Sequence, residues 1–209
     1  MEIVQYLKDI YGYGTPIFLK DIRIGRKSKT AIRKELSRAT KENKIIRRSQ
    51  GVYYFKEDSD MPKELSFEEI VTRKFICDDG GVKGFDFFTF GYFSGQTFLN
   101  MIGISQQVPA VLEITTNKTS CKRIFTSGGY RAVLRKGRTD ITFQNYKILQ
   151  FFDMLASFIT IDQIRENQKL LYEYIENNFT KNDLYTYIRY YKNKVMKILV
   201  EEKLIYAFR

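Results

Sequence analysis

Hydrophobic residues in the first 55 positions change from helical spacing to strand spacing along the chain. Apolar residues recur every three or four positions over residues 2–11 and again over residues 28–43, which predicts two amphipathic helices. In the second helix Ile32, Leu36 and Ala39 share a face, and Ser28 or Thr30 can cap the start. Two β-type runs follow and are separated by a short turn with glycine, which predicts a hairpin. They span residues 45–48 and 52–55.

A short helix is also predicted between the two amphipathic ones. Thr15 can cap it and Pro16 suits the first helical position, while Ile17, Phe18 and Ile22 would pack beneath the basic helix. Three short helices followed by a hairpin form the pattern of a winged helix-turn-helix, which we predict for residues 1–58.

The rest of the chain predicts a larger mixed domain over residues 63–209. A polar, acidic segment with a proline, 56–62, is interpreted as the linker, and 78–84 as a loop. Helices are expected at 66–76, 94–102, 142–158, 162–179 and 181–203, and strands at 85–90, 109–116, 121–125 and 130–134. The last two strands are predicted to form a hairpin that turns at residues 126–129, a segment with two glycines. The predicted fold class is therefore α+β: a winged helix-turn-helix, then a domain with a small sheet and C-terminal helices that cap it.

Positive charge is concentrated in the predicted helix and hairpin. The chain of 209 residues has a net charge of +11, and Lys20 to Arg48 alone holds twelve Lys or Arg against three Asp or Glu. Such a run can be a solvated face, but an ordinary exposed helix would mix the signs, so we favour a nucleic-acid interface. The candidate DNA-binding residues are Lys27, Ser28, Lys29, Thr30, Arg33, Lys34, Ser37, Arg38, Arg47 and Arg48.

A second group of six basic residues, with no acidic residue among them, occurs between residues 121 and 138. Either it is a solvated sheet face or it is a second functional surface. Its members are Lys122, Arg123, Arg131, Arg135, Lys136 and Arg138.

Composition excludes several kinds of site. The chain has no histidine, so Ser–His–Asp and Cys–His catalysis are excluded and the commonest metal ligand is missing. The cysteines, Cys77 and Cys121, fit no CxxC spacing and are expected to be reduced thiols in a cytoplasmic protein. No stretch approaches about 18 apolar residues, so no membrane span is expected. We expect no catalytic residues, no metal and no cofactor.

Two segments resemble one known family. AIRKELSRATKENKIIRRSQGVYY (31–54) and GYFSGQTFLNMIGISQQVPAVLEITTNK (91–118) are similar to the AbiEi abortive-infection family of type IV antitoxins, and the resemblance covers about residues 1–155. It implies a winged helix that represses its own operon by binding promoter DNA. It also implies a C-terminal domain that counteracts a nucleotidyltransferase-like toxin, for which a stable complex is not required. On this reading the second group of six basic residues is the predicted antitoxin surface.

Two other functions are compatible with the sequence. A winged-helix transcriptional regulator whose second domain senses a small ligand is the first alternative. An enzyme acting on nucleic acid is the second, but it would need clustered carboxylates for metal, whereas the acidic residues here are scattered.

Overall fold

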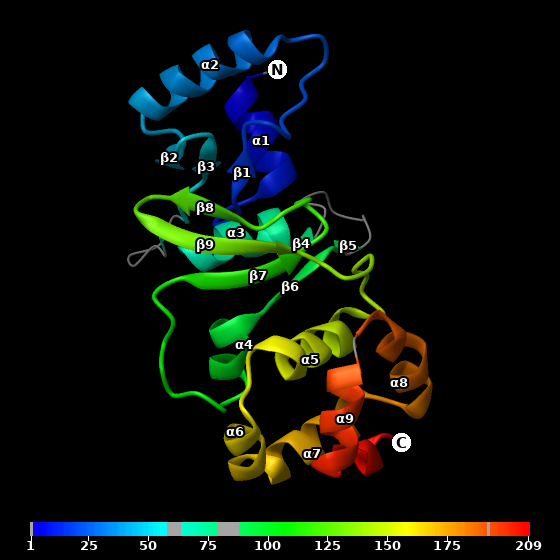
Figure 1. The fold of residues 1–209 in the computed structure, drawn as a ribbon. Helices are drawn as coiled ribbons and strands as arrows, with labels where there is room; N and C mark the ends of the chain where they lie inside the picture. Colours follow the sequence, from blue (N-terminus) through cyan, green and yellow to red (C-terminus); the bar gives the residue numbers. More distant parts are fainter. Residues whose placement is uncertain (1, 58–63, 79–87, 192) are drawn as a thin grey trace. The chain divides into compact units, whose positions relative to one another are not determined.

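The computed structural model describes residues 2–57, 64–78, 88–191 and 193–209. Its elements form a mixed α+β protein with small sheets (Figure 1). Contacts between residues group the chain into two compact units, which are described separately below. Unit 1 consists of Met1–Lys74, Asp78–Phe88 and Thr126–Tyr130, and unit 2 of Phe75–Cys77, Thr89–Phe125 and Arg131–Arg209. The predicted linker 56–62 lies mostly outside the described residues, and the predicted domain boundary stays a prediction.

Unit 1 is built from helices on a three-stranded antiparallel sheet. The sheet has the order β1-β3-β2, with Ile17 opposite Tyr53 and Ile46 opposite Tyr54. The apolar faces of α1 and α2 bury Leu7 and Leu36 in a common core. The elements of this unit are α1 (Ile3–Tyr11), β1 (Ile17–Phe18), α2 (Lys29–Lys41), β2 (Ile46–Ser49), β3 (Val52–Tyr54) and α3 (Phe67–Phe75).

The limits of α2 follow from local chemistry. The Ser28 hydroxyl accepts a hydrogen bond from the backbone N–H of Ala31 at 3.2 Å, so the predicted cap is confirmed. The helix ends because Asn43 adopts a left-handed conformation with φ 55°, which asparagine tolerates better than most residues. The predicted hairpin after it is also confirmed, and its turn is completed by Gly51 with φ +74°.

The helix predicted after Thr15 is wrong. Ile17 and Phe18 form the strand β1 instead, followed by a turn at residues 19–21. Pairing with β3 satisfies the backbone here, and the N–H of Leu19 also donates to the carbonyl of Gly51 at 2.9 Å. Both side chains are buried, one on each face of the strand, which a half-buried helix would not achieve. The described order is helix, strand, turn, helix and hairpin.

Unit 2 contains a four-stranded sheet of order β6-β7-β9-β8. β6 and β7 are antiparallel, whereas β7 and β9 are parallel, with Ile114 opposite Leu134. The predicted hairpin between β8 and β9 turns at Gly128 and Gly129, both with positive φ, and this turn groups with unit 1. The strands and first helix are β4 (Cys77–Asp78), β5 (Phe88–Thr89), β6 (Gly91–Phe93), α4 (Gly95–Met101), β7 (Leu112–Thr116), β8 (Arg123–Ser127) and β9 (Tyr130–Lys136). The loop predicted at 78–84 and the start of the strand predicted at 85–90 lie outside the described residues.

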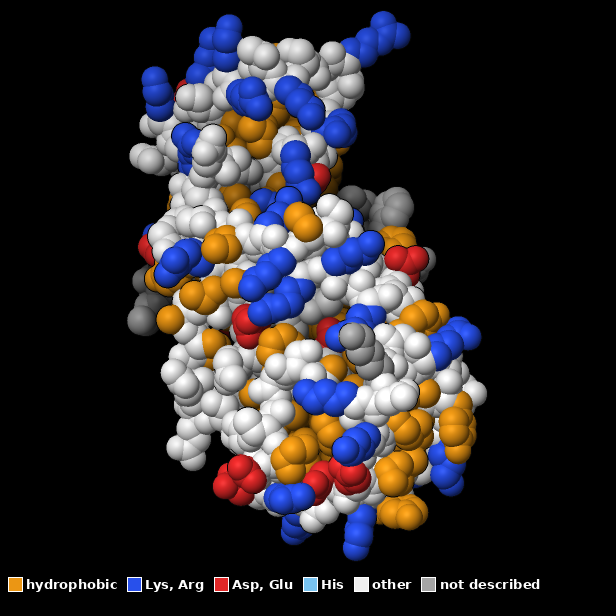
Figure 2. Space-filling view, in the orientation of Figure 1, with side chains coloured by type: hydrophobic (Ala, Val, Ile, Leu, Met, Phe, Trp, Pro, Cys, Tyr) orange, Lys and Arg blue, Asp and Glu red, His pale blue; other side chains and the backbone are white. Residues whose placement is uncertain are grey.

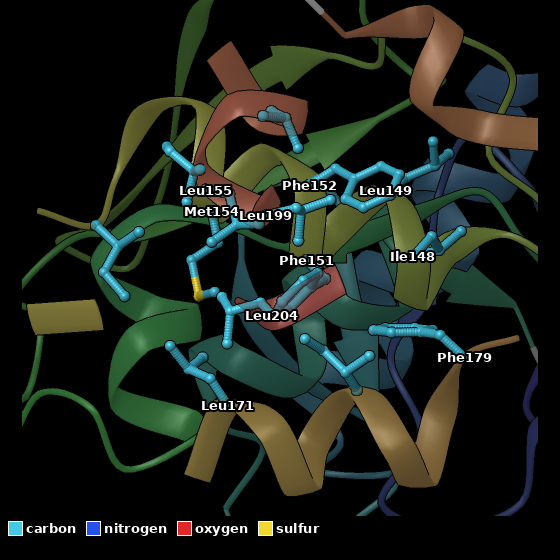
Figure 3. Close-up of a cluster of buried hydrophobic side chains, with 14 of the residues drawn as sticks. Ile148, Leu149, Phe151, Phe152, Met154, Leu155, Leu171, Phe179, Leu199 and Leu204 are labelled. Carbon is cyan, nitrogen blue, oxygen red and sulfur yellow. The ribbon is translucent and has the colours of Figure 1, made fainter. Parts of the chain in front are cut away.

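The helix α5 (Tyr146–Ser157) forms the centre of the hydrophobic core of unit 2. It contacts β6 on one side and the C-terminal helices on the other. Figure 3 shows Phe151 and Phe152 of α5 among Leu171, Leu199 and Leu204 from those helices. The C-terminal elements are α6 (Ile161–Glu166), α7 (Gln168–Asn178), α8 (Lys181–Tyr187), α9 (Asn193–Glu201) and the 3-10 helices η1 (Ile188–Tyr190) and η2 (Leu204–Ala207).

The two long C-terminal helices predicted at 162–179 and 181–203 are each broken. Asn167 ends α6 and begins α7, and Tyr191 has extended backbone angles between η1 and α9. Both breaks let short helices wrap around α5 instead of running past it. In the described part of the chain, no helix has the length and apolar character needed to cross a membrane.

Candidate nucleic-acid interface

The exposed side of α2 carries two rows of polar and basic side chains. Lys29, Arg33 and Ser37 are four residues apart and form one row, while Thr30 and Lys34 begin the next, which Arg38 extends. All six side chains are exposed, because Ile32, Leu36 and Ala39 occupy the opposite, buried face. The helix therefore presents basic charge over a wide arc of its surface.

A groove of about 640 Å³ lies beside the first row, within unit 1. The described residues that line it include five cations, and none of the described lining residues is acidic. Figure 2 shows blue Lys and Arg side chains around an orange hydrophobic floor in the N-terminal part of the molecule. The lining residues are Phe18, Leu19, Lys20, Lys29, Arg33, Ser37, Arg47, Gln50, Gly51, Val52, Tyr53 and Lys74.

The sheet holds the floor of the groove in place. Phe18 and Tyr53 are each only 6% exposed, and β1–β3 pairing sets Phe18 opposite Val52. On one wall the ammonium of Lys74 lies 5.5 Å from the centroid of the Phe18 ring. A groove with a rigid apolar floor and a cationic rim suits an anionic ligand whose charges lie at its surface.

Three other predicted DNA-binding residues have partners inside unit 1. The Lys27 ammonium pairs with the Glu35 carboxylate at 2.7 Å, and Ser28 caps α2. The half-buried Arg48 donates from Nε to the carbonyl oxygen of Leu65 at 3.0 Å. Arg48 is absent from the groove lining, although its neighbour Arg47 is exposed and lines it.

The groove thus brings together four of the ten predicted DNA-binding residues and adds others. Lys29, Arg33, Ser37 and Arg47 line it. Lys20 lies in the basic run but was not among the candidates, and Lys74 comes from α3, well beyond the predicted winged helix. No local pattern in the sequence connects Lys74 with the basic helix, so only the tertiary fold reveals it.

The six residues of the predicted antitoxin surface do not share one face. Alternation along β9 places Arg131 and Arg135 on the side opposite Lys136. Arg135 Nη2 pairs with the Glu113 carboxylate at 2.8 Å, and its guanidinium lies 5.2 Å from the centroid of the Phe158 ring. Lys122, Arg123, Arg131 and Lys136 are exposed.

Arg138, the sixth residue, belongs to a partly buried polar cluster in unit 2. Its Nε donates to Asp153 Oδ1 at 3.2 Å, and the hydroxyl of Tyr92 donates to Asp153 Oδ2 at 2.7 Å. Burial, and then the Asp153 charge, raise the pKa of Tyr92 well above that of an ordinary tyrosine. Tyr191, which packs under the Arg138 guanidinium, has its pKa raised by the same two causes. Neither phenol is therefore suited to release a proton near neutral pH.

Comparison with known proteins identifies no relative. No family model matches the chain, and neither a curated protein nor a solved structure matches it. Among the described residues, no group of three or more His, Cys, Asp and Glu side chains is placed to hold a metal ion.

Proposed function

We propose that this protein binds double-stranded DNA through the groove between α2 and the β2–β3 hairpin. One observation carries the proposal: five cations from four separate segments line the groove, with no acidic residue among the described lining residues. Duplex DNA carries one phosphate charge per about 1.7 Å of helix axis, so a cluster of this kind gains free energy by releasing condensed counterions.

The proposed reading head is a variant of the winged helix. α2 would enter the major groove, which is about 12 Å wide, and the β2–β3 hairpin would lie along a neighbouring phosphate strand as the wing. In this variant the strand β1 and its turn stand where the second helix of a helix-turn-helix would be. The exposed second row, with Thr30, Lys34 and Arg38, would face the DNA from the other side of α2.

We further propose that the protein is a type IV antitoxin that represses its own operon. This part depends on the resemblance of residues 31–54 and 91–118 to the AbiEi antitoxins. Its functional partner would be a nucleotidyltransferase-like toxin encoded by the adjacent gene. Of the predicted antitoxin surface, Lys122, Arg123 and Arg131 are three exposed cations, and Arg123 Nη2 also donates to the carbonyl oxygen of Lys118 at 3.2 Å.

Salt-dependent binding tests the DNA-binding part. Fluorescence anisotropy with a labelled duplex from the upstream region should give a log affinity that falls linearly with log salt. Replacing Lys29, Arg33 and Arg47 together by alanine should lower the magnitude of that slope by about 2.7, at about 0.9 for each phosphate contact. Lys169→Ala, whose side chain is 92% exposed in unit 2, is the matched control. A wild-type protein that does not bind duplex, or a triple variant with the wild-type slope, refutes the proposal.

Growth rescue tests the antitoxin part. The chain is co-expressed with the product of the adjacent gene, and Lys122, Arg123 and Arg131 are changed together to glutamate. Rescue should be lost while the slope of log duplex affinity against log salt stays at the wild-type value, because none of the three lines the groove. Full rescue by this variant would refute the antitoxin surface, and failure of the wild-type chain to rescue growth would refute the antitoxin function itself.

A further inference from the structure

Two lysines that line the groove come from outside both α2 and the hairpin. Lys20 follows β1, and Lys74 lies in the last turn of α3. We propose that Lys20 and Lys74 form a phosphate clamp, a second contact with the DNA backbone that extends the reading head beyond the helix and the wing. This inference deepens the proposed DNA-binding function and rests on it.

The backbone around Lys20 is fixed beside the hairpin. The N–H of Leu19 donates to the Gly51 carbonyl at 2.9 Å, next to the hairpin turn. Arg23 Nη1 donates to the carbonyl oxygens of Lys20 at 2.6 Å and of Ile22 at 3.0 Å, which closes the turn after β1. The Lys20 side chain is exposed, so its ammonium projects from a constrained backbone.

Lys74 is positioned by the packing of α3. The Ser66 hydroxyl and the Glu69 carboxylate exchange hydrogen bonds with each other's backbone N–H groups at the start of this helix. Near its end the guanidinium of Arg73 lies 5.4 Å from the centroid of the Tyr11 ring, and the Lys74 ammonium lies over Phe18. Lys74 is thus directed into the groove by contacts with α1 and β1.

The chemistry of the groove selects a duplex backbone over a single strand. Proteins that bind single strands stack bases on accessible aromatic rings. The aromatic rings here, Phe18 and Tyr53, are 6% exposed and are covered by their own sheet and by Lys74. On the cationic rim Lys20 is exposed and Lys74 is half-buried. Lysine ammonium groups bind phosphate as point charges without reading the base.

The test replaces both clamp lysines by glutamine in the full-length chain and repeats the salt titration with duplex DNA. Glutamine keeps much of the aliphatic stem that packs on Phe18 but removes the charge. The magnitude of the log–log slope should fall by about 1.8, which changes the affinity ratio between 50 and 200 mM salt by about twelvefold. The ratio of affinities for the upstream duplex and a scrambled duplex should stay the same, since phosphate contacts carry no sequence information. Lys74→Arg should retain the wild-type slope, and Lys169→Gln is the control.

The outcomes separate this inference from the proposed function. If the wild-type chain does not bind duplex, both fail. If the Lys29, Arg33 and Arg47 triple variant loses slope but the Lys20 and Lys74 double variant does not, the clamp is wrong and the DNA-binding function stands. Circular dichroism confirms folding, and if the Lys74 variant unfolds, Lys20→Gln alone should still lower the slope by about 0.9. Tighter binding to the single strand than to the duplex would also overturn the clamp.

Discussion

Replacing Arg47 and Arg48 by alanine, one at a time, should separate DNA binding from stability. The two residues are adjacent in β2, and the sequence places both in the DNA-binding set. In the structure Arg47 is exposed and lines the groove, whereas Arg48 bonds to the carbonyl of Leu65 and lies beside the turn at Gly128. The pairing register of β2 shifts between Arg47 and Ser49, and the two arginine side chains meet different surroundings.

The expected changes in salt slope and in unfolding free energy follow from these surroundings. Loss of a phosphate contact at Arg47 should lower the magnitude of the salt slope by about 0.9, with less than about 0.5 kcal/mol change in the free energy of unfolding. Arg48→Ala removes a charge-assisted hydrogen bond, worth about 1.5–3 kcal/mol in a fully buried site. Because Arg48 is only half-buried and water can reach part of it, we expect about 1–2 kcal/mol of lost stability and an unchanged slope.

Urea denaturation followed by circular dichroism gives the stability of each variant, and anisotropy titrations at four or more salt concentrations give the slopes. Lys169→Ala serves as the control in both assays. An Arg48→Ala variant that keeps wild-type stability and loses as much slope as Arg47→Ala would contradict this assignment, because Arg48 would then be a phosphate ligand and not a support for the hairpin.

Three further predictions concern unit 2. A Cβ at Gly91 would overlap with the backbone carbonyl oxygen of Phe75, which cannot move aside, so Gly91→Ala should cost more than about 2 kcal/mol of unfolding free energy in urea. Asp153→Asn should cost about 1.5–3 kcal/mol in the same assay, since it removes the charged acceptor of two hydrogen bonds. The Arg165 guanidinium lowers the pKa of the Glu202 carboxyl, so their pairing contributes stability above the ordinary carboxyl range and loses it as pH falls through the lowered pKa. The stability difference between wild type and Arg165→Gln should therefore shrink on acidification below about pH 4.5, and a constant difference would contradict this.

Several helices and turns could be predicted from residues within or next to them. α2 and its Ser28 cap, the hairpin with Gly51 and the glycine turn of β8–β9 were predicted because their capping, period and turn residues are all local. The prediction of a helix after Thr15 was wrong because Ile17 and Phe18 pair with β3, which is more than thirty residues away in the sequence. The breaks at Asn167 and Tyr191 were not predicted because the apolar period continues across them, while packing around α5 decides where each helix stops.

The candidate site also combines residues that the sequence could indicate with contacts that it could not. Lys29, Arg33 and Arg47 could be proposed because they lie in one basic run. The sequence could not show which arginines already bind a partner within the protein, because those partners are distant in sequence. They are Leu65 for Arg48, Glu113 for Arg135 and Asp153 for Arg138. Charge counting identifies the run, but only the fold shows which charges remain for a ligand.

The turn of the β8–β9 hairpin has a consequence for how the protein is made. Ser127 in this hairpin shares a hydrogen bond of 2.6 Å with Ser49 of β2, and Tyr130 stacks on Phe67 of α3 with ring centroids 5.6 Å apart. Ser49 and Ser127 are 78 residues apart, so at about 5–20 residues per second the ribosome needs about 4–16 s to supply the later partner. Throughout that interval the β2–β3 hairpin lacks the hydrogen bond between Ser49 and Ser127. Full duplex affinity is therefore expected only from chains that extend past Tyr130, and nascent chains stalled before it should bind more weakly.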